Sequence, residues 1–253
     1  MDFHLAIIST SRPQNVEFMQ SMCEPYKCHW YVNLGEYQAY EDAGAHVINE
    51  CALNICHARN QAIKDADELG IPCIQISDDL RNIKSIIIDS NGKRKTQFET
   101  VNNICNELIH QLHENNLFYG GVAISSNPLN YTGVDTSIDK LIVNDFICLM
   151  PGAGLFDEAL ALKEDYDMSI RQLLGCGGIA RLNNILCDFP HRQNNGGANT
   201  YRNDSTEAEA TKKLLAKWPN FVRMNPRRPG QVLLNYKAIR EYKNNNQSNL
   251  FDL

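Results

Sequence analysis

The amino-acid sequence predicts an α/β fold of the Rossmann type, with a mostly parallel sheet flanked by helices. Short apolar runs alternate with segments whose apolar residues recur every three or four positions, and this alternation is typical of strands followed by amphipathic helices. The chain has 253 residues, of which 43% are hydrophobic and 21% charged. This composition is ordinary for a globular protein, and the length suffices for one large α/β domain.

The first 80 residues carry the clearest strand and helix pattern. Strands are predicted at residues 5–9, 29–32 and 72–77. Pro13 fits the first turn of a helix after the first strand, and residues 54–69 present one apolar helical face that Gly70 ends. This order of strands and helices predicts parallel strands with helices on both faces of the sheet.

The rest of the chain continues the pattern less regularly. Helices are predicted at residues 99–113, 166–174 and 205–217, and strands at residues 121–124 and 141–150. Ser205 would open the last of these helices, followed by an acidic first turn. Residues 190–204 are polar and predict a loop, in which Gly196 and Gly197 would allow folding over a ligand. We expect one domain over residues 1–242 and a disordered polar tail over residues 243–253.

Charge, cysteine content and hydropathy exclude several classes of protein. The net charge of −6 argues against an indiscriminate polyanion binder, although it allows a local basic patch. The nine cysteines are scattered and form no Cys-x-x-Cys motif, which favours reduced, mostly buried thiols over a disulfide scaffold or a zinc site. No apolar run approaches the ~18 residues of a membrane span, and the first residues lack the basic region of a signal peptide. We therefore expect a cytoplasmic protein with no membrane segment.

Two adjacent carboxylates, Asp78 and Asp79, follow the predicted strand at residues 72–77. Ligands of open α/β sheets bind beyond the carboxyl ends of the strands. Adjacent carboxylates repel each other when sheltered from water, and a hard divalent cation would offset their charge. The alternative is an ordinary turn or helix N-cap, where pairs of aspartates are common.

A second acidic group lies further along the chain. The triplet FDE at residues 156–158 is followed by EDYDMSIR at residues 164–171. Here the acids crowd the expected start of a helix, where the helix dipole favours negative charge. An acidic first turn on a solvated helix would explain the pattern equally well.

In this order, these motifs resemble those of GT-A glycosyltransferases, especially the ones related to family 2. The helix-start motif follows the strand-terminal motif by about 85 residues, and HARN at residues 57–60 resembles the Ala-Arg-Asn segment that precedes the metal-carrying strand. The resemblance covers roughly residues 3–190. One departure is the metal motif itself, which is SDDL at residues 77–80 rather than a strict Asp-x-Asp.

Within this superfamily, the chain resembles the TET/JBP-associated glycosyltransferases. These enzymes decorate hydroxymethylated pyrimidines in DNA and occur in phages and in relatives that make glucosylated thymine. The compact size, the Gly-Gly loop after His191 and the NPRR segment at residues 225–228 carry the likeness. It implies a UDP-sugar donor, Mn²⁺ or Mg²⁺ and a DNA acceptor. The sugar, the acceptor base (cytosine or uracil) and the oligomeric state are left open.

The resemblance also implies roles for individual residues. Asp165 would be the general base of an inverting transfer, with Glu164 taking the role if the motif shifts by one. Donor binding would fall to Ser9, Thr10, Arg12, Arg59 and Asp78. Metal binding would fall to Asp78, Asp79 and His191. Acceptor DNA would contact Arg192, Arg202, Arg227 and Arg228.

For several of these residues, a position on the surface with no role in a site is the alternative. Arg59 could be a surface arginine on an amphipathic helix, and His191 a surface loop histidine. The basic residues between positions 223 and 243 could form a solvated face or a diphosphate clamp. For the whole chain, the alternatives are a GT-A enzyme with a carbohydrate, protein or small-molecule acceptor, and a catalytically silent nucleotide-binding or protein-interaction module.

Overall fold

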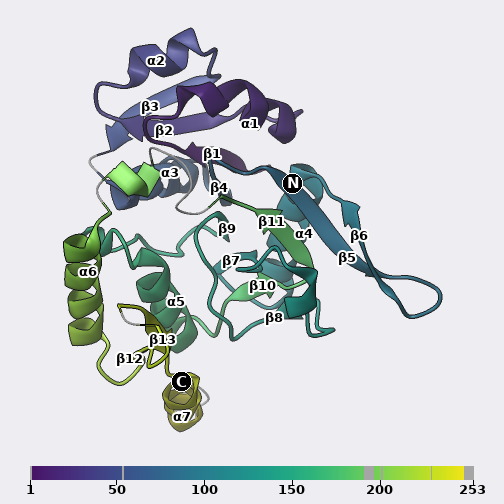
Figure 1. Cartoon of the computed structure of the whole chain (residues 1–253), viewed down its shortest axis with the longest axis vertical. Helices are drawn as coiled ribbons and strands as arrows, with labels where there is room; N and C mark the ends of the chain where they lie inside the picture. The colour runs from purple at the N-terminus through teal and green to yellow at the C-terminus, as the bar shows by residue number, and fades with distance from the viewer. Residues whose placement is uncertain (1, 53, 191–196, 201, 229, 248–253) are drawn as a thin grey trace.

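A central eight-stranded sheet runs through the molecule in the strand order β3-β2-β1-β4-β9-β7-β10-β8 (Figure 1). The computed structural model describes residues 2–52, 54–190, 197–200, 202–228 and 230–247. The strands of this sheet are β1 (His4–Ile8), β2 (His29–Asn33), β3 (Val47–Ala52), β4 (Cys73–Ser77), β7 (Tyr119–Val122), β8 (Thr136–Ser137), β9 (Phe146–Leu149) and β10 (Ala180–Leu182). The first four strands in this order run parallel, and β7 runs parallel to β10. The predicted mostly parallel sheet flanked by helices is therefore confirmed.

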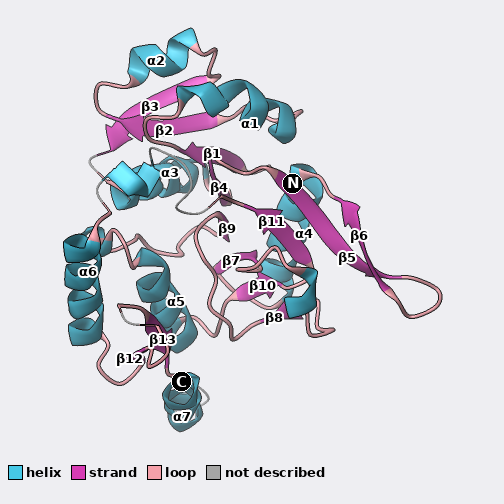
Figure 2. Cartoon of the chain, in the orientation of Figure 1, coloured by secondary structure: helices cyan, strands magenta, loops and turns pink. Residues whose placement is uncertain are grey.

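Two smaller sheets and seven α-helices complete the described structure (Figure 2). One sheet contains β11 (Ile185–Asp188), β5 (Asn82–Ile88) and β6 (Arg94–Phe98), and the other contains β12 (Val222–Met224) and β13 (Val232–Leu234). The helices are α1 (Val16–Cys23), α2 (Tyr37–Asp42), α3 (Ile55–Leu69), α4 (Val101–Glu114), α5 (Glu164–Gly175), α6 (Asp204–Lys217) and α7 (Tyr236–Gln247).

The central sheet is covered on both faces, and its first strand shows why the sequence there is continuously apolar. Leu5 and Ile7 of β1 join the core that α1 and α4 share, whereas Ala6 and Ile8 join the core that includes α3 and α5. Because successive side chains of a strand point to opposite faces, a strand buried on both sides needs apolar residues at every position.

Helix α3 forms where the sequence predicts it. The Asn54 side chain caps its first turn by accepting hydrogen bonds from the backbone N–H groups of Cys56 (2.9 Å) and His57 (3.2 Å). Gly70 ends the helix in the left-handed conformation, with φ +66°. This helix carries Arg59 and Asn60 against the sheet, where both are buried.

Other boundaries differ from the expectations. The strand expected at residues 141–150 is only β9 (Phe146–Leu149), and it runs antiparallel to both β4 and β7. Helix α6 begins at Asp204, and its cap is Asn203 rather than Ser205, because Asn203 and Thr206 exchange hydrogen bonds in a capping box. Helix α7 continues to Gln247, so residues 243–247 are helical and not part of a polar tail; residues 248–253 lie outside the described part.

The expectation for the cysteines is confirmed. All nine are free thiols, and seven of them are buried. Among the described residues, no group of three or more His, Cys, Asp or Glu side chains is arranged to hold a metal ion. Within the same residues, none of the helices has both the length and the apolar content needed to cross a membrane.

Candidate active site

A polar cavity of about 330 Å³ lies at the carboxyl ends of β1 and β4. Residues that follow both strands line it, together with the start of α3, the start of α5, residues 143–145 before β9, and part of the segment between residues 197 and 202. Nine predicted site residues line this one cavity: Ser9, Thr10, Arg12, Arg59, Asp78, Asp79, Glu164, Asp165 and Arg202. The fold therefore brings the two acidic motifs, distant in sequence, to the same place.

Arg12 joins the two carboxylates at the end of β4. Its Nη1 lies 2.7 Å from Oδ1 of Asp78 and 3.1 Å from Oδ2 of Asp79. The Ser9 hydroxyl donates to the other oxygen of Asp78. Burial raises the pKa of the Asp78 carboxyl to about 6, although the Arg12 charge and the Ser9 hydroxyl favour its ionised form. Asp78 and Asp79 do form a turn after β4, but Asp78 is only 2% exposed, so this turn is buried at the cavity.

These carboxylates suit a divalent cation. Each oxygen of Asp78 already accepts a hydrogen bond, but each has a second lone pair, so a metal ion can bind beside Arg12 or in its place. The charges of the cavity favour a cation when an anionic ligand binds. Three arginines and five carboxylates line it, which gives a formal charge of −2. A nucleoside diphosphate would add negative charge, and a hard cation with oxygen ligands would offset it.

Arg59 is buried beneath the cavity rather than exposed on the helix surface. Only 2% of it is exposed, and its Nη1 donates to Oε1 of Gln75 at 3.1 Å. Its Nε has no hydrogen-bond partner among the described residues and lies 3.9 Å from Oε1 of Glu164. The alternative of a surface arginine is therefore wrong. A buried guanidinium with an unpaired N–H group is suited to a ligand oxygen.

Glu164 and Asp165 begin α5 and face the same cavity. Asn144 holds Glu164 through an Nδ2–Oε1 contact of 3.3 Å, and the Tyr119 hydroxyl donates in turn to Asn144. Asp165 accepts the backbone N–H of Tyr166 at 2.8 Å. Burial, together with the negative charge of Glu164, raises the pKa of Asp165 to about 7. A carboxyl group with such a pKa can accept a proton near neutral pH.

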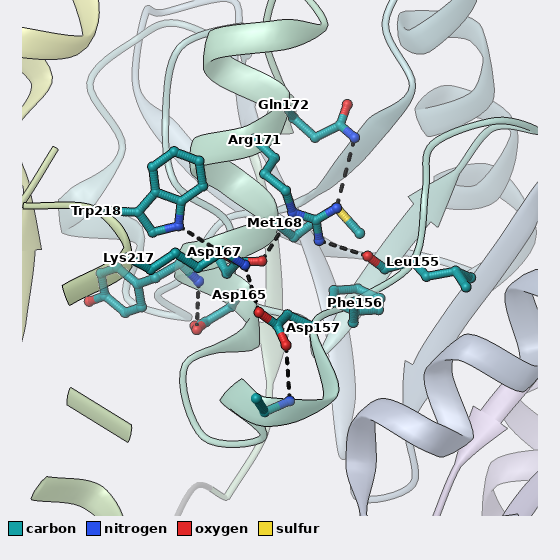
Figure 3. Close-up of polar contacts among 12 residues, drawn as sticks. Leu155, Phe156, Asp157, Asp165, Asp167, Met168, Arg171, Gln172, Lys217 and Trp218 are labelled. Atoms are coloured by element: carbon teal, nitrogen blue, oxygen red, sulfur yellow. Dashed lines mark hydrogen bonds and ion pairs between the residues drawn. The ribbon is translucent and has the colours of Figure 1, made fainter. Parts of the chain in front are cut away.

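The next acid of the helix, Asp167, has a different role. It is fully buried and points away from the cavity lining, toward residues of α5 and the end of α6 (Figure 3). Trp218 Nε1 donates to it at 2.7 Å, Lys217 Nζ lies 2.8 Å away and Arg171 Nε 3.0 Å. Lys217 also pairs with Asp157 at 2.6 Å. Asp157 and Asp167 therefore tie α5 to α6, whereas Glu164 and Asp165 serve the cavity.

Four predicted residues are not part of the described cavity. Arg227 and Arg228 are exposed in the turn between β12 and β13 and do not line it. His191 and Arg192 lie outside the described residues. Arg202 lines the cavity but its Nε pairs with Glu207 at 3.0 Å. At the far end of α5, Lys243 donates to the carbonyl of Gly177 at 2.6 Å, so the basic C-terminal segment does not gather around the cavity.

The sequence analysis missed the polar residues before β9. Asn144 and Asp145 line the cavity, and the Asp145 carbonyl accepts the N–H of Ser77 at 2.8 Å. Because β9 is antiparallel to β4, its amino end lies where β4 has its carboxyl end. The signal was present as two polar residues inside an otherwise apolar run, LIVNDFICLM at residues 141–150.

Gly197 lies against Arg12 at the edge of the cavity. Its N–H donates to the carbonyl of Thr10 at 2.9 Å, and a Cβ atom there would lie 2.9 Å from Nη2 of Arg12. Its φ of +58° also favours glycine. The backbone conformation of this position thus favours glycine, and a larger side chain there would push the Arg12 guanidinium aside; Gly196 lies outside the described residues.

The sequence matches no protein-family model, and no curated protein matches it at a significant level.

Proposed function

We propose that this chain is a GT-A-type glycosyltransferase that moves a sugar from a UDP-sugar to the hydroxyl of a 5-hydroxymethylpyrimidine in DNA. One observation carries the proposal: the strand-end pair Asp78–Asp79 and the helix-start pair Glu164–Asp165 line the same cavity at the carboxyl ends of β1 and β4. That edge of an open α/β sheet is where nucleotides bind. The mostly parallel sheet with helices on both faces is compatible with the fold that the proposal requires.

The donor side of the proposed reaction uses the polar residues that follow β1. The backbone and side chains of Ser9 and Thr10 would contact the nucleotide, and Arg12 and Arg59 would bind diphosphate oxygens through charge-assisted hydrogen bonds. Mn²⁺ or Mg²⁺, held by Asp78 and Asp79, would supply positive charge to stabilise the departing nucleoside diphosphate.

The acceptor side uses Asp165. Its carboxylate removes the proton of the acceptor hydroxyl while the new bond to the anomeric carbon forms and the bond from that carbon to the diphosphate oxygen breaks. A single attack from the side opposite the diphosphate inverts the anomeric carbon. Asn144 holds Glu164 close to Arg59, and the position of Glu164 beside Asp165 helps to raise the pKa of Asp165.

A second candidate is the same donor chemistry with a carbohydrate, protein or small-molecule acceptor. The formal charge of −2 in the cavity lining favours this candidate, because it repels a polyanionic acceptor. The two candidates share every residue of the donor side and differ only in what approaches Asp165.

Release of UDP from a panel of UDP-sugars tests the proposal. With Mn²⁺ present, we expect release from at least one donor, and faster release when DNA containing hydroxymethylpyrimidine is added. Release that only another acceptor accelerates would move the assignment to the second candidate. No release from any nucleotide sugar, with or without acceptors, would contradict the glycosyltransferase proposal.

A further inference from the structure

A two-stranded arm projects from the rim of the cavity. Strands β5 and β6 pair antiparallel and extend away from the rest of the molecule (Figure 2). The turn at their tip closes with a hydrogen bond from the Asp89 N–H to the Lys93 carbonyl at 2.9 Å. With seven residues in β5, the arm is about 23 Å long at ~3.3 Å per residue.

The arm begins close to the proposed reaction centre. Asp79 lines the cavity and Asn82 begins β5, so the two are separated by three residue steps. A fully extended chain covers at most about 10 Å in that distance. A long ligand that reaches the cavity on the side of Asp79 therefore lies close to the base of the arm.

The arm is basic in an acidic protein. Residues 81–98 contain five cationic side chains and one acidic side chain, Asp89, whereas the whole chain has a net charge of −6. The cationic residues are Arg81, Lys84, Lys93, Arg94 and Lys95. Asp89 pairs with Lys95 at 3.0 Å, which leaves the arm with a clear excess of positive charge.

Aromatic rings are interleaved with these cations. Lys84 Nζ lies 5.4 Å from the centre of the Phe98 ring, and the Arg94 guanidinium lies 5.2 Å from the centre of the Tyr131 ring. Lys84 and Phe98 are cross-strand partners, so they share one face of the hairpin. Phe98 is 79% exposed, so its ring is open to a ligand.

We propose that this hairpin, residues 81–98, binds the phosphate backbone of the acceptor DNA and that Phe98 stacks on an unpaired base beside the modified nucleotide. Cations along a groove or arm, together with exposed aromatic rings, are the features by which proteins hold single strands without reading sequence. The inference rests on the proposed function, because it takes DNA to be the acceptor. It moves the DNA contact from the C-terminal arginines to the arm.

The exposed edge of β6 could instead pair with a strand from another protein, but the charges of the arm argue against this alternative. Strand β6 pairs only with β5 among the described strands, and its residues are all exposed. However, cationic side chains on an edge strand oppose pairing with a second copy of the same edge. A polyanion matches the charge of the arm.

Variants in which glutamine replaces basic residues test the inference. A variant of the arm is compared with a control variant at lysines elsewhere on the surface and with a variant of the C-terminal arginines. The arm variant carries Lys84→Gln, Lys93→Gln and Lys95→Gln. The control carries Lys64→Gln, Lys212→Gln and Lys213→Gln, which are exposed lysines on α3 and α6. A third protein, Arg227→Gln with Arg228→Gln, tests the C-terminal arginines. Affinity for a fluorescent single strand of about 20 nucleotides is measured against salt, and melting temperature verifies folding.

We expect the arm variant to bind at least tenfold more weakly at low salt and its salt slope to fall by about 2, since each lost phosphate contact removes ~0.7 on single strands. Phe98→Ala should weaken binding with the salt slope unchanged, because stacking releases no counterions. Equal affinities of the arm variant and the control, or a larger loss in the Arg227 and Arg228 protein, would overturn the inference.

The same experiment separates failure of the arm from failure of the proposed function. If the native protein adds sugar to hydroxymethylpyrimidine DNA and the arm variant has the same KM for that DNA, only the inference about the arm is wrong. If the native protein releases UDP with another acceptor and does not bind DNA at low salt, both the DNA acceptor and the arm are wrong.

Discussion

At the scale of single residues, the start of α5 divides its acids between two tasks. Asp165 faces the cavity and holds a pKa raised to about 7 by burial and by Glu164. Asp167, two residues later, is surrounded by Trp218, Lys217 and Arg171. The first arrangement leaves a carboxylate whose charge is poorly compensated, as expected of a group that exchanges a proton. The second arrangement satisfies the carboxylate fully and is structural.

Replacing Asp165 by Asn should abolish sugar transfer while donor binding is retained. Its raised pKa also has a consequence for stability. The folded state keeps a proton on Asp165 that the unfolded state loses near pH 4, so this group lowers stability as pH rises from about 4 to about 7. The variant should therefore unfold at an equal or higher temperature than the native protein at pH 8. Transfer at the native rate would contradict the role of Asp165.

The rate of transfer should depend on pH through the same group. Because the base must be ionised, kcat/KM should rise as pH increases from about 6 to about 8, with a midpoint near 7. Initial rates with the acceptor well below its KM, in a panel of overlapping buffers, give this profile. A rate that is flat over the range, or that falls with rising pH, is incompatible with Asp165 as the base.

At the scale of elements, the spacing of apolar residues predicted the strands that are buried on both faces and the helices that pack one face against the core. Strands β1, β2 and β4 and helices α3 and α4 lie close to their predicted positions because their apolar spacing reports burial directly. Strand β6 was missed because all its side chains are exposed, and β5 because a serine lies among its buried residues and its last two isoleucines are exposed. Strand β9 was overextended because Asn144 and Asp145 form a turn that lines the cavity, and the apolar residues before that turn are not part of a strand.

The tether between α5 and α6 gives a prediction at this scale. Replacing Asp167 by Ala removes the acceptor of Trp218 Nε1 and the partner of two cations, and should destabilise the protein by about 3 kcal/mol, as for a broken buried ion pair. Two of its partners are about one-third exposed and can regain water, so a larger loss is not expected. Denaturant unfolding measures the change. Stability equal to that of the native protein would show that the tether is not structural.

At the scale of the whole molecule, charge is distributed unevenly. The chain is acidic, the cavity lining carries a formal charge of −2, and the β5–β6 arm is basic. The sequence located the cavity residues of both motifs, since each follows a buried strand or starts a helix. It did not locate Asn144, Asp145 or the arm, because their positions depend on the antiparallel insertion of β9 and on a hairpin whose second strand, β6, is entirely exposed.

The negative cavity predicts that donor binding depends on a divalent cation. After treatment with EDTA, affinity for UDP should fall at least tenfold, and Mn²⁺ or Mg²⁺ should restore it. In an Asp79→Asn variant, adding the cation after EDTA treatment should restore much less of the affinity for UDP. Calorimetric titration with UDP measures this affinity, and it does not require the enzyme to catalyse transfer. Tight binding of UDP in EDTA would mean that Arg12 and Arg59 alone compensate the diphosphate charge.

The intact mass of an acceptor DNA tests the central claim most directly. A single strand with one 5-hydroxymethylpyrimidine is incubated with the protein, Mn²⁺ and the UDP-sugar that releases UDP, beside a strand with the unmodified base. The account predicts a gain of one sugar on the hydroxymethylated strand and none on the other. A strand of unchanged mass, while UDP accumulates, would contradict DNA as the acceptor.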